Sequence, residues 1–358
     1  HLQDRFEYGD VLNCRCTYTP PEKKGRGLCR EGESNYEYQA AIFRPELSAK
    51  ERLPEMKKKT QCIREIYTGT QGAEKLPRIS ENESYEEFSA QFQTRRFPLG
   101  YSLLNMKPVA LPLQQFSMLS LYFGNPNSVK PVMKNILYWA AKEEAQVILV
   151  KRKTDSVFGA QNGLLEQIGI REENVQVFRS TKEDCSELWQ QMMEILKERN
   201  KEFQDYCEAN GISANNQNIA KKMTDFMQKN TRPIITVIEK FSDFCENKDE
   251  GADTIYPSIF KALKFYNIYY LGGFYQEEEM YGEPITSAFN PEALIMLIGG
   301  KLDRQHLVNL PYEVQRKNEG NKYNQCLMKY RNEYYPLYIP CDALTDEQID
   351  EEERSIFQ

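Results

Sequence analysis

Short apolar runs alternate along residues 97–358 with segments whose apolar residues recur at helical spacing. Strands are predicted where these runs are four to six residues long: 118–123, 146–151, 175–178, 234–238, 268–271 and 294–298. Helices are predicted between them: 132–143, 163–168, a long helix from 187, a second one around 223–227, and 259–265. Because the runs are continuous rather than alternating, they predict an α/β fold with a mainly parallel central sheet and helices on both faces.

The first 90 residues follow a weaker pattern. It predicts a strand at 11–18, two short strands within 20–43, a polar helix at 48–66 and a Gly-, Ser- and Glu-rich linker at 69–85. Few of these segments are strongly apolar, so residues 1–90 are expected to be the end of a preceding domain plus a linker. Residues 91–358 then form a second domain with an acidic C-terminal tail. Residues 320–340 are predicted to form an antiparallel pair of strands at the edge of its sheet.

The composition of the chain limits the classes of partner and environment that are expected. Hydrophobic residues make up 40% of the 358 and charged residues 28%, so a packed core is expected. The net charge of −7 argues against nucleic acid as the main partner, because affinity for a phosphate backbone comes from clustered Lys and Arg. No run approaches the roughly 18 apolar residues that a membrane span needs, and no signal peptide is visible.

The nine cysteines are scattered without a CxxC pair, and there are only two histidines, His1 and His306. Neither a zinc site nor a His-dependent catalytic triad is therefore predicted, and no catalytic or metal-binding residue is assigned. Cys14 and Cys16 are open to two interpretations, a redox pair or alternate positions of one strand. A reducing cytoplasmic compartment fits this cysteine usage.

The stretch FGNPNSVKPV, residues 123–132, has the order of a phosphate-binding loop: the end of a strand, a loop opened by glycine, and the start of a helix. The pattern of such loops is GxxxxGK[ST]. Aligned on its lysine, Gly124 is the first glycine and Lys130 is the lysine. The candidate phosphate contacts are Gly124, Asn127, Ser128 and Lys130.

Two positions depart from this pattern. Val129 stands at the second glycine, and Pro131 stands where a Ser or Thr would coordinate magnesium. A β-branched side chain disfavours the close approach of backbone to phosphate, and proline has neither a hydroxyl nor an N–H. Proline is tolerated in the first turn of a helix. The loop is therefore expected to keep its place in the fold while the nucleotide site is degenerate.

The partner motif is PIITVIEKFSDF, residues 233–244, in which an apolar strand ends at Glu239. This is the position of the acid that assists magnesium in related sites, where two carboxylates are usual. Here Lys240 follows, and its ammonium would either repel magnesium or pair with Glu239. ATP and magnesium are thus not expected as cofactors unless the degenerate site keeps residual competence.

Three further segments carry a family resemblance. KGRGLCREGESNYEYQAAIF at 24–43 resembles the PGRG…E-x-Q-x-A ending of FtsK/SpoIIIE-type ATPase domains, RFPLGYSLLNMKPVALPL at 96–113 resembles the entry strands of the next domain, and LIGGKLDRQ at 297–305 is similar to their LGG-x-x-x-x-Q segment. The matching residues of the first segment are Gly25, Arg26, Gly27, Glu37, Gln39 and Ala41. The order of the motifs resembles EssC/EccC-type motor ATPases of the type VII secretion system.

This resemblance implies a RecA-like P-loop NTPase fold, with residues 1–90 ending the preceding ATPase domain. It also implies a terminal pseudo-ATPase domain that recognises secreted effector proteins or their targeting chaperones, while other domains hydrolyse ATP. The alternative is a residual ATP-binding motor domain that drives translocation of protein or, less in keeping with the charge, DNA. The resemblance further implies contact with the preceding ATPase domains of the same chain and assembly into a homo-hexamer in the full machine. It also implies a location at the cytoplasmic face of the bacterial membrane.

Two segments of the sequence each allow two interpretations. The aromatic stretch FYNIYYLGGFY at 265–275 either supplies contact residues for a partner or belongs to the core. The acidic stretch at 345–353 is either a solvated end of the chain or a docking tail.

Overall fold

The computed structural model describes residues 26–31, 34–39, 43–44, 46–66, 79, 83–154, 156–158, 164–168, 170–213, 215–247, 256–275, 294–305, 307–317 and 321–342. The predicted strand at 11–18, most of the predicted linker, His306 and the acidic stretch lie outside these residues. The chain divides into two compact units, residues 1–75 and 76–358. The division falls before the expected boundary at 90, because Phe88 of helix α3 (Tyr85–Ala90) is fully buried in the core of the second unit.

Unit 1 contains the antiparallel hairpin of β1 (Arg26–Glu31) and β2 (Ser34–Gln39), followed by α2 (Ala49–Ile66). Both the hairpin and the helix were predicted from the sequence and are confirmed. Among the described residues of this unit no large apolar side chain is buried, and on α2 four are exposed by 46–73%: Leu53, Met56, Ile63 and Ile66.

Unit 2 is built on a ten-stranded sheet with the order β4-β3-β12-β11-β10-β5-β9-β8-β6-β7. Its strands are β3 (Arg96–Ser102), β4 (Pro108–Pro112), β5 (Met118–Phe123), β6 (Gln146–Lys151), β7 (Val175–Arg179), β8 (Ile234–Ile238), β9 (Ile268–Tyr275), β10 (Leu294–Gly300), β11 (Asn321–Tyr330) and β12 (Glu333–Tyr338). The six from β10 to β7 are parallel, and the other four continue the sheet in antiparallel fashion. The predicted mainly parallel sheet is confirmed.

The prediction that residues 320–340 lie at the edge of the sheet is wrong. Their strands β11 and β12 do pair with each other, but β12 also pairs with β3, where Leu337 stands opposite Ser102. The entry strands β3 and β4 therefore occupy the outer positions on this side. A pairing between strands more than 200 residues apart leaves no signal in the local pattern of either one.

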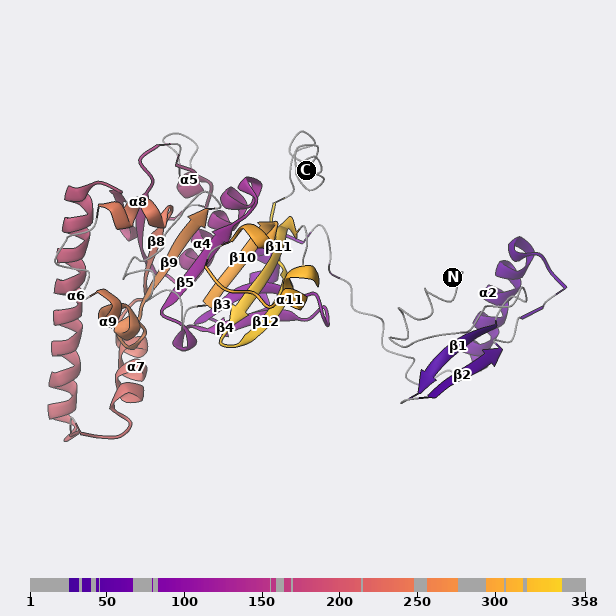
Figure 1. Ribbon diagram of the computed structural model, residues 1–358. Helices are drawn as coiled ribbons and strands as arrows, with labels where there is room; N and C mark the ends of the chain where they lie inside the picture. The colour runs from indigo at the N-terminus through magenta and orange to yellow at the C-terminus, as the bar shows by residue number, and fades with distance from the viewer. Residues whose placement is uncertain are drawn as a thin grey trace. The chain divides into compact units, whose positions relative to one another are not determined.

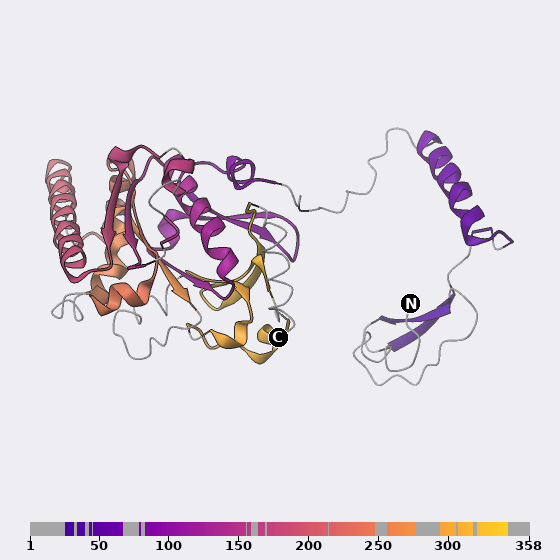
Figure 2. The ribbon, with the colours of Figure 1, turned by 90° about the horizontal axis from the view of Figure 1, so that it is seen from above.

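Helices cover both faces of the sheet, as predicted (Figures 1 and 2). One core contains residues of α3, α4 (Val129–Lys142) and α5 (Leu164–Ile168). The other contains residues of α6 (Lys182–Ala209), α8 (Phe241–Glu246) and α9 (Tyr256–Ala262). The remaining described α-helices are α7 (Ile219–Asn230) and α11 (Tyr312–Lys317).

The central strands are buried on both faces, which explains their continuous apolar sequences. In β5 all six residues are buried, with Leu119 and Leu121 in one core and Met118 and Tyr122 in the other. β9 lies between β5 and β8, and seven of its eight residues are buried. The interpretation of the aromatic stretch at 265–275 as a partner surface is therefore wrong for β9, because its rings fill the core.

Helix α6 begins at Lys182, five residues before the predicted start. Its first turn is polar and was missed by a search for apolar periodicity. The signal is the cap, since the Thr181 hydroxyl accepts a hydrogen bond from the Asp184 N–H. The helix packs Leu188 and Met192 on the sheet and then continues beyond it beside α7, forming a hairpin whose Phe203 is buried (Figure 1).

One buried arginine fixes this hairpin to the sheet. Arg199 of α6 is 9% exposed, and its guanidinium donates to the carbonyls of Tyr266, Asn267 (3.3 Å) and Arg232 (2.9 Å). These carbonyls lie just before β8 and β9. Burial lowers the pKa of Arg199 to about 10, so the side chain stays charged at neutral pH and its donors remain available. Replacing it would take a charged donor from the Tyr266 and Arg232 carbonyls, whereas the Asn267 carbonyl would keep the hydrogen bond from the Ile234 N–H (3.1 Å).

The substitution Arg199→Met is expected to lower the free energy of unfolding of unit 2 by about 3 kcal/mol, because buried carbonyls lose a charged donor. The control Lys201→Met, at an exposed position of the same helix, is expected to change it by less than about 0.5 kcal/mol. Urea unfolding followed by tryptophan fluorescence measures this, since Trp139 and Trp189 are the two tryptophans of the chain and both lie in unit 2. Equal stability of the two variants would contradict the role given to Arg199.

Candidate functional site

The two predicted halves of the site lie at one edge of the parallel sheet. Gly124 follows β5 and Glu239 follows β8, with β9 between the two strands. The carboxyl ends of parallel strands meet at the same edge, and ligands of open α/β sheets bind there. The structure therefore brings the predicted loop and the predicted acid to the place where a nucleotide would be bound.

The segment 124–131 is not an open loop. Pro126–Ser128 form one turn of 3₁₀ helix, which runs directly into α4. Val129 has helical backbone angles, φ −62° and ψ −59°, and is only 6% exposed. The residue at the position of the second glycine is thus a core residue inside a helix, and the wide backbone turn that surrounds a phosphate is absent from this segment.

Four of the six backbone N–H groups of this segment have acceptors within the protein. Four N–H groups donate to neighbouring oxygens: Gly124 to the Ile298 carbonyl, Asn127 to the Asn125 side chain, Ser128 to the Asn125 carbonyl and Val129 to the Pro126 carbonyl. Pro126 and Pro131 have no N–H to offer. A phosphate cradle needs several N–H groups turned toward the ligand, and this segment uses them to close on itself.

A turn from the next strand seals the segment. Gly299 and Gly300, at the end of β10, have φ angles of +64° and +68°. A Cβ on Gly299 would lie 2.6 Å from that of Asn125, and one on Gly300 would lie 2.3 Å from the Gly124 carbonyl oxygen. Only glycine allows both this backbone conformation and this close approach. The motif LIGGK therefore has a packing role against the loop.

The Ser128 hydroxyl is also occupied. It donates to the Tyr323 carbonyl over 2.7 Å, and Ser128 is fully buried. Of the four predicted phosphate contacts, Lys130 is exposed and Asn127 is half-buried. The structure thus places the four residues in one segment, and it turns the Lys130 side chain to solvent.

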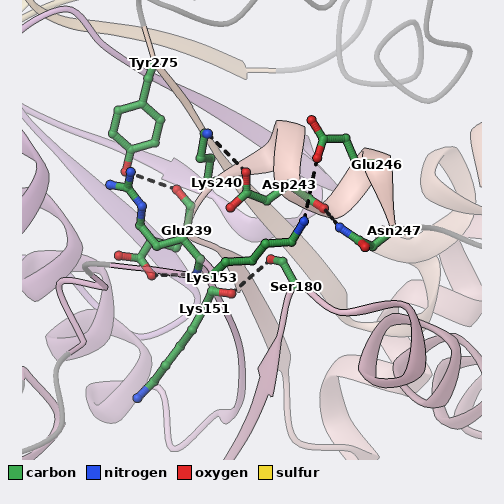
Figure 3. A network of polar contacts seen from close by, with 10 residues as sticks. Lys151, Lys153, Ser180, Glu239, Lys240, Asp243, Glu246, Asn247 and Tyr275 are labelled. Carbon is green, nitrogen blue, oxygen red and sulfur yellow. Dashed lines mark hydrogen bonds and ion pairs between the residues drawn. The ribbon is translucent and has the colours of Figure 1, made fainter.

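Glu239 is fully buried at the end of β8. Its carboxylate accepts hydrogen bonds from the Arg152 N–H (3.0 Å), the Ser156 hydroxyl (2.6 Å) and the Val157 N–H (2.7 Å). Its backbone carbonyl accepts a hydrogen bond from the Tyr275 hydroxyl (3.2 Å), as Figure 3 shows. The acid therefore anchors the segment after β6 to the end of β8.

Of the two alternatives for Lys240, the structure does not form the ion pair with Glu239. Lys240 bonds to Asp243, with 3.1 Å between the Nζ and Oδ1 atoms (Figure 3). The reason is local geometry, because residues three apart at a helix start lie on the same face, whereas the Glu239 side chain points into the protein. The sequence signal for this pair is the spacing of Asp243, three residues after Lys240.

A magnesium triphosphate would need free N–H groups, a hydroxyl and accessible carboxylates. In this arrangement the N–H groups and the Ser128 hydroxyl bond to the protein, and Glu239 has three donors and no exposed surface. The residues present do not fit such a ligand in this conformation. Their chemistry is that of a packed strand–helix junction with an exposed lysine.

No protein-family model and no curated protein sequence matches the chain. The solved structure of the cytoplasmic domain of EssC does match, with a TM-score of 0.56 and 17% identity, over 94% of this chain and 62% of that one. EssC (ATPases 2 and 3) from Geobacillus thermodenitrificans matches with a TM-score of 0.59 and 16% identity, over 94% of this chain and 59% of that one.

The chain has the fold of the EssC cytoplasmic ATPase domains. Thermomonospora curvata EccC (ATPases 2 and 3), in complex with a signal sequence peptide, is also similar, with a TM-score of 0.53, 12% identity and coverage of 91% of this chain and 55% of that one. The predicted RecA-like ATPase fold is thus confirmed. The chain spans about 60% of the length of these EssC and EccC structures. Within the described residues, no helix is both long and apolar enough to cross a membrane.

Two contributors to the site were missed in the sequence. One is the Tyr323 carbonyl, which binds Ser128 from 195 residues away and leaves no local signal. The other is the pair of Ser156 and Val157, whose donors surround Glu239. LIGGK was singled out for its resemblance alone. Its two adjacent glycines at the end of a strand are a signal for a close backbone approach.

The substitution Glu239→Gln is expected to lower the free energy of unfolding of unit 2 by about 2 to 3 kcal/mol, because the amide replaces a buried acceptor among three donors. A solvent-facing active-site acid behaves differently, since its removal is commonly neutral or stabilising. Lys130→Gln is the matched control, with an expected change under about 0.5 kcal/mol. Urea unfolding followed by tryptophan fluorescence compares the two variants, and a Glu239→Gln protein as stable as the control would show that the carboxylate is not structural.

Proposed function

We propose that this chain is a pseudo-ATPase module of a type VII secretion motor, and that it recognises proteins rather than hydrolysing ATP. The observation that carries the proposal is the closure of segment 124–131 within a fold otherwise shared with EssC ATPase domains. The N–H groups, the hydroxyl and the acid that a nucleotide would require are each engaged by a different part of the protein. Three independent losses at one edge of the sheet argue against a site that a small side-chain movement would restore.

The retained fold supports a role in recognition. Core strands β5, β8 and β10 are buried at nearly every position, so the scaffold is intact where the chemistry is missing. A fold that keeps its packing without its site is available for surface functions. The EccC structure contains a signal sequence peptide. By analogy, the ligands proposed here are secreted effector proteins or their targeting chaperones.

The proposed setting is the cytoplasmic face of a bacterial membrane, within a longer motor chain that assembles as a hexamer. Unit 1 supports contact with a preceding ATPase domain of the same chain, because the apolar residues Leu53, Met56, Ile63 and Ile66 of α2 are exposed. Exposed apolar patches of this kind are typical of surfaces that another domain covers. The net charge of −7 supports protein rather than nucleic acid as the translocated partner.

Titration with a fluorescent ATP analogue tests the loss of nucleotide binding. No magnesium-dependent binding is expected up to about 1 mM, which corresponds to a binding free energy weaker than about −4 kcal/mol. Lys130→Ala is expected to give the same flat titration as the unchanged protein, and an active P-loop ATPase in the same assay is the positive control. Micromolar, magnesium-dependent binding that Lys130→Ala abolishes would overturn the proposal in favour of a residual ATP-binding motor domain.

Recognition is tested by capturing purified type VII secreted proteins and their chaperones on the immobilised chain. At least one is expected to bind with a dissociation constant in the micromolar range, equally well with and without ATP and magnesium, because the proposed surface does not depend on a nucleotide. The rate of ATP hydrolysis by the Lys130→Ala variant is expected to be no lower than that of the unchanged chain. Capture that appears only when ATP is present would contradict this function. The same capture by a chain without residues 345–358 measures the contribution of the acidic stretch.

A further inference from the structure

The structure leaves a row of apolar side chains exposed on α2. Leu53, Met56 and Ile63 keep 46–56% of their surface exposed to solvent. With Thr60 they are spaced three, four and three residues apart, which is the spacing of positions a and d in a helix that packs along another helix. At about 100° per residue the four side chains lie within an arc of about 80°. We call these four residues the α2 seam, and their spacing indicates that the element covering them is a helix.

The seam can be covered at little polar cost. Its one hydroxyl, on Thr60, already donates to the Met56 carbonyl over 2.8 Å. Ile66, three residues after Ile63, is 73% exposed and extends the apolar surface to the end of the helix. Covering the seam therefore removes apolar surface from water without leaving a side-chain donor unpaired.

Basic side chains border the seam on both sides. Lys50 and Lys57, seven residues apart, lie on one side of it, at position e of the heptad. Arg52 and Lys59, also seven residues apart, lie on the other side, at position g. The three lysines are exposed, whereas Arg52 is half-buried and donates to two carbonyls that precede the helix. Three exposed ammonium groups are thus placed where the helices of a coiled coil form ion pairs with each other.

The acidic side chains of α2 lie on the far side of the helix. They are Glu51, Glu55 and Glu65, and each is at least about 120° from the centre of the seam. Lys58 shares the side of Glu51 and Glu65, because these three residues are spaced seven apart. The charge beside the seam is therefore positive, although the chain as a whole carries −7.

This arrangement of charge selects among the occupants of the seam. A second copy of α2 would place lysine rows against lysine rows in either orientation, because positions e and g both carry cations. A helix bound to an anionic membrane surface carries cations across its polar face, whereas the polar face of α2 has three acids. A helix with acids beside its own apolar seam pairs with Lys50, Lys57 and Lys59.

We propose that the α2 seam binds an amphipathic helix of a partner domain whose positions e and g are acidic. The two helices form a short coiled coil, in which carboxylates face Lys50 and Lys57 on one side and Lys59 on the other. The inference rests on the proposed function for the source of this helix, which is the preceding ATPase domain of the same chain. Its test involves no nucleotide, so the inference and the proposed loss of ATP binding can fail separately.

Binding of two designed peptides to the intact chain tests the charge of the occupant. Both peptides have four heptads, about 28 residues, with Leu or Ile at positions a and d. One has Glu at every position e and g, and the other has Lys there. Fluorescence anisotropy is expected to show micromolar binding of the acidic peptide and at least about tenfold weaker binding of the basic one, because like charges beside the seam repel. At 1 M salt, where the Debye length is about 3 Å, this difference is expected to shrink.

Neighbouring lysines of α2 supply a matched pair of variants. Lys57→Glu places an acid beside the seam and is expected to weaken binding of the acidic peptide about fivefold or more. Lys58→Glu makes the same change on the far side of the helix and is expected to alter the affinity by less than about twofold. Ile63→Gln, at an exposed position of the seam, is expected to abolish detectable binding.

Four results would overturn the proposal. One is equal binding of the two peptides, or no binding of either at about 1 mM. Another is equal weakening of binding by Lys57→Glu and Lys58→Glu. A third is self-association of the chain that Ile63→Gln abolishes, measured by analytical ultracentrifugation, because the seam would then bind a second copy. The fourth is flotation of the chain with phosphatidylserine vesicles that both lysine variants weaken equally, because α2 would then bind a membrane surface.

Discussion

The hydrogen bond from Ser128 to the Tyr323 carbonyl, together with the glycine turn packed beside it, determines what this edge of the sheet can bind. It draws the start of α4 toward β11 and leaves the segment 124–131 in helical geometry. In that geometry the N–H groups find acceptors within the segment or on β10. A phosphate would have to displace protein acceptors that are already in place, and two prolines reduce the donors it would gain.

The carboxylate of Glu239 has a structural role at a position where related sites have an acid that assists magnesium. A buried charge is tolerated only when it is well hydrogen-bonded, and here three donors surround it. Those donors come from the segment after β6, so the acid fixes this segment to the end of the neighbouring strand β8. With the acid buried and bound, Lys240 is left to pair with Asp243, and the second acid usual at magnesium sites is replaced by a surface ion pair.

The start of α4 and the end of the described chain lie beside each other. Lys130 of this helix is exposed. Residues 340–342 are held against α4 and β11 by contacts with Asn135, Lys134 and Tyr323.

The sequence by itself determined the layered α/β architecture, because the local periodicity of apolar residues identifies continuous apolar strands and amphipathic helices. It also placed Gly124 and Glu239 at the ends of two strands, where the structure has them, and it showed that Val129 and Pro131 depart from the phosphate-loop pattern. Only the tertiary structure decided that β11 and β12 lie inside the sheet, that the Ser128 hydroxyl belongs to Tyr323, and that Glu239 faces inward. Each of these depends on contacts between residues about 80 to 240 positions apart. Such contacts are set by the packing of whole elements, which no short stretch of the chain records.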